Sequence, residues 1–119
     1  MPIKRWPDWG RYIKDRCRCQ YCDLDGAQDI RLYRQMQIDH LIPDLLPDRD
    51  VELNKVVACR GCNCMKGSYD PSGGGRVALT EATRPMLIAA ARKHVEERYR
   101  KNWDLDYEEM MRAIRTPAA

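Results

Sequence analysis

The 119-residue chain contains no phenylalanine, only two histidines and no long apolar segment. Three tryptophans and six tyrosines must therefore supply the aromatic packing of any core. The longest apolar stretch, residues 86–91, is far shorter than the ~20 residues that cross a bilayer. The N-terminal MPIKRWPDWG has no apolar run behind its charges, unlike a secretory signal. These absences argue against a membrane-bound protein and favour a soluble protein of the cytoplasm.

Length and charge set further limits. The chain fits one compact domain, because its 44% hydrophobic residues can build a core but leave little surplus. The net charge of +3 is modest, but the basic residues gather in two segments, 1–18 and 84–101. They are Lys4, Arg5, Arg11, Lys14, Arg16 and Arg18, then Arg84, Arg92, Lys93, Arg98, Arg100 and Lys101. Such flanks can hold a phosphate backbone, or they can simply be solvated helix faces.

The central segment, residues 19–70, shows two strand patterns and one helix pattern. Apolar and polar residues alternate over residues 30–38, which predicts a strand running into the next two residues. Lys55 is followed by the β-branched Val56 and Val57, and this short segment predicts a second strand. Residues 59–66 suit one or two helical turns that Gly67 ends.

Helices are predicted on both sides of this segment. A short helix around residues 12–14 precedes it, and a flexible connector at residues 72–75 follows it. After the connector, Thr83 can cap a long helix with Pro85 in its first turn. One face of that helix carries an apolar stripe, formed by Ile88, Ala91, Val95 and Tyr99.

A last helix is indicated near the C-terminus. Asp106 and Glu109 have the spacing of a capping box, and Leu105 and Met110 are placed to form a hydrophobic staple across it. The resulting organisation is a core with a basic lead-in over residues 1–70, and a helical extension over residues 76–119 packed on the same domain.

Four of the six cysteines form two CxxC pairs, Cys19–Cys22 and Cys59–Cys62. Thiols stay reduced inside cells, and two such knuckles present four thiolates at the ~2.3 Å reach of Zn²⁺. A redox-active CxxC or buried structural thiols would not account for two matched pairs. We therefore predict a four-cysteine zinc, which is structural because four thiolates leave no position for water.

Two cysteines, Cys17 and Cys64, remain outside the pairs. Cys17 can in principle replace Cys19, since the loop from Cys17 to Cys22 is also workable. The simpler expectation is that Cys17 is incidental and that Cys64 packs under its helix as a small apolar side chain.

Between the cysteine pairs lie residues suited to a second, catalytic metal. Asp39 and His40 end the first predicted strand, Asn54 precedes the second, and Asn63 follows the last cysteine of the pairs. A carboxylate and an amide oxygen suit a hard, octahedral cation such as Mg²⁺. A neutral imidazole beside them suits a general base that takes a proton from an attacking water. A lone histidine is more often structural, but this one follows an aspartate inside a cysteine-bounded hairpin.

These motifs resemble the HNH endonuclease superfamily. CQYC, IDHLIP, ELN and ACRGCNCMKG are similar to the family's CxYC, DHxxP, an asparagine before the second strand, and CxxCNxxKG. The resemblance spans residues 17–69. The spacing is also similar to that in the HNH domain of RNA-guided CRISPR nucleases, which share the final asparagine. The chain departs from many relatives at residues 44–53, where they carry a pair of glycines.

The resemblance implies an α+β fold, with a small zinc-stapled ββα-metal core and flanking helices. It implies that His40 is the general base and that Asp39, His40 and Asn63 make up the site of one catalytic Mg²⁺ or Mn²⁺. Asn54 would order the loop and the orientation of His40. Lys66 would either contact a phosphate or be a solvated lysine at the end of its helix.

The implied function is a metal-dependent endonuclease that hydrolyses phosphodiester bonds of DNA, which we expect to be double-stranded. Nothing in the sequence is suited to reading bases, so we expect low specificity. Arg92, Lys93 and Arg100 are predicted to bind the phosphate backbone. The alternative is a non-catalytic zinc-knuckle module that binds DNA or a protein. The C-terminal helices also permit a partner protein or self-association, as in the nuclease subunit of a larger phage, restriction or defence machine.

Overall fold

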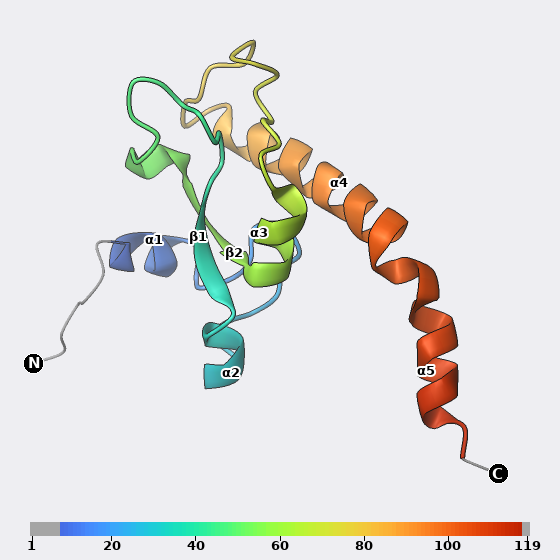
Figure 1. Ribbon diagram of the computed structural model, residues 1–119. Helices are drawn as coiled ribbons and strands as arrows, with labels where there is room; N and C mark the ends of the chain where they lie inside the picture. The colour runs from blue at the N-terminus through green and yellow to red at the C-terminus, as the bar shows by residue number, and fades with distance from the viewer. Residues whose placement is uncertain (1–7, 118–119) are drawn as a thin grey trace, which may run out of the picture.

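Two antiparallel strands and one short helix form the centre of the protein. The computed structural model describes residues 8–117, so Lys4, Arg5 and Trp6 lie outside the described range. Strand β1 (Met36–His40) pairs with β2 (Lys55–Cys59), with Met36 opposite Cys59 and His40 opposite Lys55. Helix α3 (Arg60–Lys66) follows β2 directly and packs on both strands (Figure 1).

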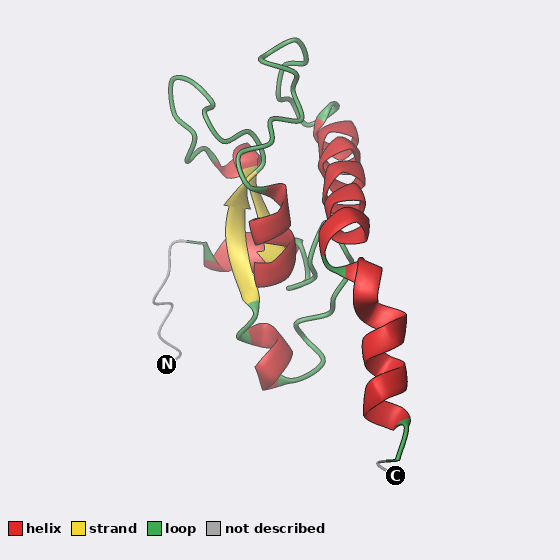
Figure 2. Cartoon of the chain, turned by 45° about the vertical axis from the view of Figure 1, so that its right-hand side comes forward, coloured by secondary structure: helices red, strands yellow, loops and turns green. Residues whose placement is uncertain are grey.

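Further helices surround this ββα unit (Figure 2). They are α1 (Trp9–Lys14), α2 (Ile30–Tyr33), the 3₁₀ turn η1 (Glu52–Asn54), α4 (Arg84–Asn102), the 3₁₀ turn η2 (Asp104–Asp106) and α5 (Tyr107–Arg115). Helix α4 lies beside α3, whereas α5 extends away from the ββα unit in both views. The α+β class and the flanking helices are as predicted.

The strand predicted from residue 30 begins later than expected. Residues 30–33 form α2 instead, because the carboxylate of Asp29 accepts hydrogen bonds from the backbone N–H groups of Arg31 and Leu32 at 2.8 and 3.0 Å. That cap satisfies the first turn of a helix and overrides the alternating pattern. Strand β2 is longer than predicted, and its residues 56–59 are all buried.

Helix α4 closes the core with the apolar stripe expected of it. Leu87, Ala91 and Val95 are buried, and Ile88 and Tyr99 pack against the same cluster. Thr83 occupies the N-cap position, but its hydroxyl donates to the Ala78 carbonyl at 2.6 Å and makes no cap bond to the helix. The predicted helix is therefore confirmed, and the predicted capping bond is wrong.

Two other local predictions are wrong. Residues 72–75 form an ordered turn, since the Asp70 carboxylate accepts hydrogen bonds from the Ser72 hydroxyl and from the backbone of Ser72 and Gly74. Leu105 and Met110 are both exposed, so the hydrophobic staple does not form. Within residues 8–117, no helix combines the length and apolar character needed to cross a membrane.

Candidate active site and metal centre

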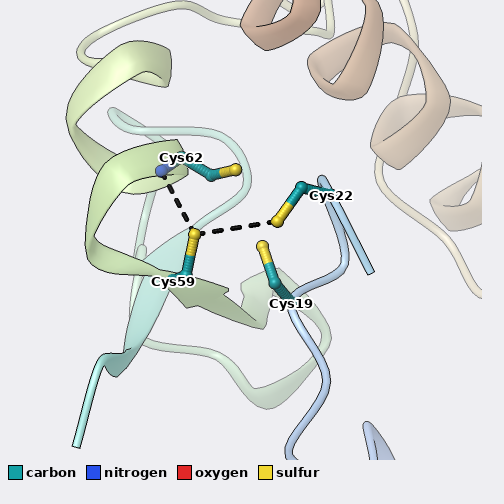
Figure 3. A group of neighbouring side chains, drawn as sticks. All are labelled: Cys19, Cys22, Cys59 and Cys62. Carbon is teal, nitrogen blue, oxygen red and sulfur yellow. Dashed lines mark hydrogen bonds between the residues drawn. The ribbon is translucent and has the colours of Figure 1, made fainter. Parts of the chain in front are cut away.

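The four cysteines of the two CxxC pairs converge on one point (Figure 3). Their sulfur atoms all lie within 4.8 Å of one another, and the Sγ atoms of Cys22 and Cys59 are 3.8 Å apart. Two sulfurs on one tetrahedral Zn²⁺ are separated by ~3.8 Å, given Zn–S bonds of ~2.3 Å. The cluster therefore has the geometry of a zinc site, as predicted. Cys17 is not a member of it, and Cys64 is exposed rather than packed under its helix.

Electrostatics in the cluster favour a bound cation. Hydrogen bonding, first from Cys22, lowers the pKa of Cys19 to about 7, and hydrogen bonding, first with Cys19, lowers the pKa of Cys59. The same contacts raise the pKa values of Cys22 and Cys62. Four thiolates this close repel one another, so all four ionise together only around a positive charge. Zn²⁺ supplies that charge, and the donor set of four sulfurs fits it.

Helix α4 and strand β2 hold the first knuckle in place. The backbone N–H of Gln20 donates to the Val57 carbonyl at 2.9 Å. On the other side, the guanidinium of Arg92 donates to the Gln20 carbonyl at 3.1 Å and to both carboxylate oxygens of Asp23 at 3.1 and 2.9 Å. Arg92, predicted from the sequence to bind DNA, is thus engaged within the protein.

Asp39 is buried on β1, and one of its carboxylate oxygens is fully used by the protein. The hydroxyl of Tyr21 donates to Oδ2 at 2.6 Å, and Nζ of Lys66 lies 3.1 Å from the same atom. Burial, followed by the adjoining carboxylate, raises the pKa of Tyr21 far above its ordinary value, so the hydroxyl remains a donor. The other oxygen, Oδ1, has no hydrogen bond among residues 8–117. Every fully buried side-chain nitrogen or oxygen in this range has a hydrogen-bond partner, so the unpartnered Oδ1 must be accessible to solvent.

Asn63 stands on α3 facing the same side of β1. Its Nδ2 donates to Oε1 of Gln37 at 2.8 Å, which leaves the Asn63 Oδ1 without a partner among the described residues. Gln37 and Asp39 are two residues apart on one strand, and side chains at that spacing share a face. The structure therefore presents two unengaged oxygens, from Asp39 and Asn63, between β1 and α3. An oxygen pair of this kind fits Mg²⁺ or Mn²⁺, which keeps waters for its remaining positions.

His40 ends β1, and its side chain contacts the loop between the strands. Its Nε2 lies 2.7 Å from Oδ1 of Asp50. Nδ1 has no hydrogen bond within residues 8–117, so a neutral imidazole that donates from Nε2 to this carboxylate has the lone pair of Nδ1 free. Asp50 is in turn held by an Asx turn, in which its backbone N–H donates to the side chain of Asp48 at 2.8 Å.

Asn54 is buried and fastens both ends of the same loop. Its Nδ2 donates to the carbonyls of Ile42 and Arg49, each at 2.9 Å, and its Oδ1 accepts from the Ile42 N–H at 2.8 Å. Ile42 follows His40 closely and Arg49 precedes Asp50, so these bonds fix the two segments that carry the imidazole and its carboxylate partner.

The surroundings of Lys66 do not suit a contact with a phosphate at the protein surface. Its side chain is fully buried, and besides its ion pair with Asp39 it donates to the His40 carbonyl at 3.0 Å. Lys93 and Arg100 are exposed and have no ion-pair partner within residues 8–117. His94, the other histidine, stacks on Tyr69 with ring centroids 4.0 Å apart.

Three residues of the site were not singled out from the sequence. Tyr21 lies inside the CQYC motif, and Gln37 lies two residues before Asp39, so both could have been proposed as site residues from their positions in the sequence. Asp50 is one of several acids in an irregular loop, and nothing in the sequence distinguishes it from Asp44 or Asp48.

Comparison with known proteins gives one match. The family model described as HNH endonuclease matches residues 19–68, which include both cysteine pairs, Asp39, His40 and Asn63. No curated protein and no solved structure matches the chain.

Removing one cysteine of the cluster should unfold the centre of the protein. We expect Cys59→Ser to lose zinc and most of its cooperative unfolding transition, because a structural zinc contributes on the order of 10 kcal/mol to folding. Elemental analysis and thermal denaturation followed by circular dichroism measure both effects. The matched control is Cys64→Ser, which changes an exposed cysteine on α3, the helix that follows Cys59. A wild-type protein that stays folded after complete removal of metal would contradict the assignment.

Proposed function

We propose, from the premise that residues 19–68 belong to the HNH endonuclease family, that this protein is a metal-dependent endonuclease that hydrolyses DNA. The observation that carries the proposal is the pair of unengaged oxygens on Asp39 and Asn63, on the strand and helix of the site, with His40 directly after Asp39 in the chain. A non-catalytic binding module has no need of this arrangement, so the rival interpretation is not favoured.

Asp39 and Asn63 would hold one Mg²⁺ or Mn²⁺ through their free oxygens. When bound, such an ion offsets negative charge on the scissile phosphate and on the leaving 3′ oxygen. Neighbouring side chains bind the remaining polar atoms of both ligand residues. Tyr21 and Lys66 fix the orientation of the Asp39 carboxylate, and Gln37 fixes which atom the Asn63 amide presents.

His40, the last residue of β1, would act as the general base. Nδ1 takes a proton from a water, and the water oxygen forms a bond to phosphorus. The bond from phosphorus to the 3′ oxygen breaks, which leaves a 5′-phosphate and, after protonation, a 3′-hydroxyl. Asp50 holds the imidazole through Nε2 and stabilises the imidazolium that forms, as a triad carboxylate does. Asp50 is thus a positioning residue.

The substrate we propose is double-stranded DNA, cut with low sequence specificity. Phosphate contacts position a protein on DNA without reading its sequence. Lys93 and Arg100 are seven residues apart on α4 and so share a side of the helix, where both are exposed. Arg92 and Lys66 are left out of this surface, because Arg92 is paired with Asp23 and Lys66 is buried against Asp39. The exposed apolar side of α5 is the part proposed to contact another protein chain.

Plasmid cleavage tests the function. Zinc-loaded protein should nick or cut supercoiled plasmid only with Mg²⁺ or Mn²⁺. His40→Ala should keep its fold and zinc but lose ~10²–10⁴ in rate, because it removes the general base. His94→Ala, which removes the stacked histidine, is the control and should cut at the wild-type rate. Cleavage at the wild-type rate by His40→Ala would exclude His40 as the base.

Replacing Asp50 should slow cleavage through His40 alone. We expect Asp50→Ala to lower kcat about tenfold with little change in KM, and Asp50→Glu to recover part of the loss. In a His40→Ala background the Asp50 change should cost nothing further, since the two groups act as one unit. Asp44→Ala, an acid of the same loop outside the site, is the matched control. Independent, additive losses in the double variant would show that Asp50 does not work through His40.

Neutralising Lys93 and Arg100 should weaken binding to all DNA sequences alike. We expect the double change to Gln to lower the slope of log affinity against log salt by about one unit for each phosphate that is no longer neutralised. Arg31→Gln together with Arg34→Gln, which also removes two exposed positive charges at α2, serves as the charge-matched control. An unchanged slope in equilibrium binding would place the phosphate contacts elsewhere.

A further inference from the structure

Helix α5 carries an apolar stripe that the rest of the described chain leaves uncovered. Tyr107, Met110 and Ile114 follow the spacing of one helix face, and their side chains are 52%, 55% and 67% exposed. Trp103 and Leu105, at the corner between α4 and α5, are exposed as well. Five of the twelve exposed large apolar side chains within residues 8–117 thus lie in this short stretch. Figures 1 and 2 show α5 projecting away from the ββα unit.

The charges beside this stripe have opposite signs at the two ends of the helix. Glu108 lies in the first turn of α5 and Arg115 in the last. Seven residues are close to two helical turns, so both side chains stand on the same flank of the stripe. Within the described residues neither has an ion-pair partner. The flank is therefore acidic at one end of the helix and basic at the other.

We propose that the partner of this face is a second copy of the chain, with the two α5 helices antiparallel. In that arrangement the apolar stripes face each other, and Glu108 of each copy lies beside Arg115 of the other. A parallel pairing would instead turn the two copies of this flank to opposite sides of the interface, so the Glu108–Arg115 ion pairs could not form. The complementarity of this flank with itself selects the antiparallel second copy over a partner of unrelated charge pattern.

The pairing is independent of the nuclease proposal, because it uses no residue of the metal centre. The contact is short, so the dimer should be weak and depend on concentration, as small interfaces do. Two such copies would carry two active sites on one particle.

Charge exchange between two variants tests the pairing. Wild-type protein should show a concentration-dependent dimer in sedimentation equilibrium. Glu108→Arg and Arg115→Glu, each alone, should dimerise about tenfold more weakly or worse, because both ion pairs become repulsive. An equimolar mixture of the two variants should recover association. One variant is then basic at both positions and the other acidic at both, so each cross-interface pair again has opposite charges. Arg112→Glu, on the side of α5 opposite the stripe, should leave the dimer unchanged.

A second variant separates loss of the apolar face from loss of the helix itself. Met110→Gln with Ile114→Gln keeps good helix formers but removes the apolar face, so helicity should persist while dimerisation is lost. A wild-type chain that is monomeric at all concentrations would overturn the proposal. So would a mixture of the two charge variants that fails to associate, or a glutamine variant that still dimerises.

Discussion

The 2.6 Å hydrogen bond from Tyr21 to Asp39 joins the cysteine cluster to the strand that carries the site. Tyr21 lies between the two cysteines of the first knuckle, so its position depends on the cluster that brings Cys19 and Cys22 against Cys59 and Cys62. A buried carboxylate is costly unless it is paired and hydrogen-bonded. Tyr21 and the buried Lys66 provide that compensation on one oxygen of Asp39, and the second oxygen stays available.

The same pattern of contacts recurs at the other residues of the site. Asn63 gives its Nδ2 to Gln37 and keeps its oxygen, and His40 gives its Nε2 to Asp50 and keeps Nδ1. In each case the protein engages the atom that the proposed reaction does not use. In the proposed reaction, such preorganisation would let the ligands and the base act without reorienting.

Much of the site could be predicted from the sequence, because its chemistry sits in closely spaced motifs. The paired CxxC spacing leads to the cluster, and the helix after Cys59 follows from the cap and from Gly67. Only the start of the strand predicted from residue 30 is wrong, because a local cap at Asp29 outweighs the alternating pattern there. Asp50 and the partner of Lys66 could not be predicted, since they depend on how an irregular loop returns to β1 and on which side of α3 faces it. The removal of Arg92 from the basic surface likewise depends on a contact between residues far apart in the chain.

Binding of Mn²⁺ to the zinc-loaded protein, followed by electron paramagnetic resonance, tests the catalytic cation site most directly. We expect one Mn²⁺ per wild-type chain, and binding at least about tenfold weaker in Asn63→Ala, whose zinc content stays unchanged. Equal Mn²⁺ affinity in wild type and Asn63→Ala would contradict a catalytic cation site between β1 and α3.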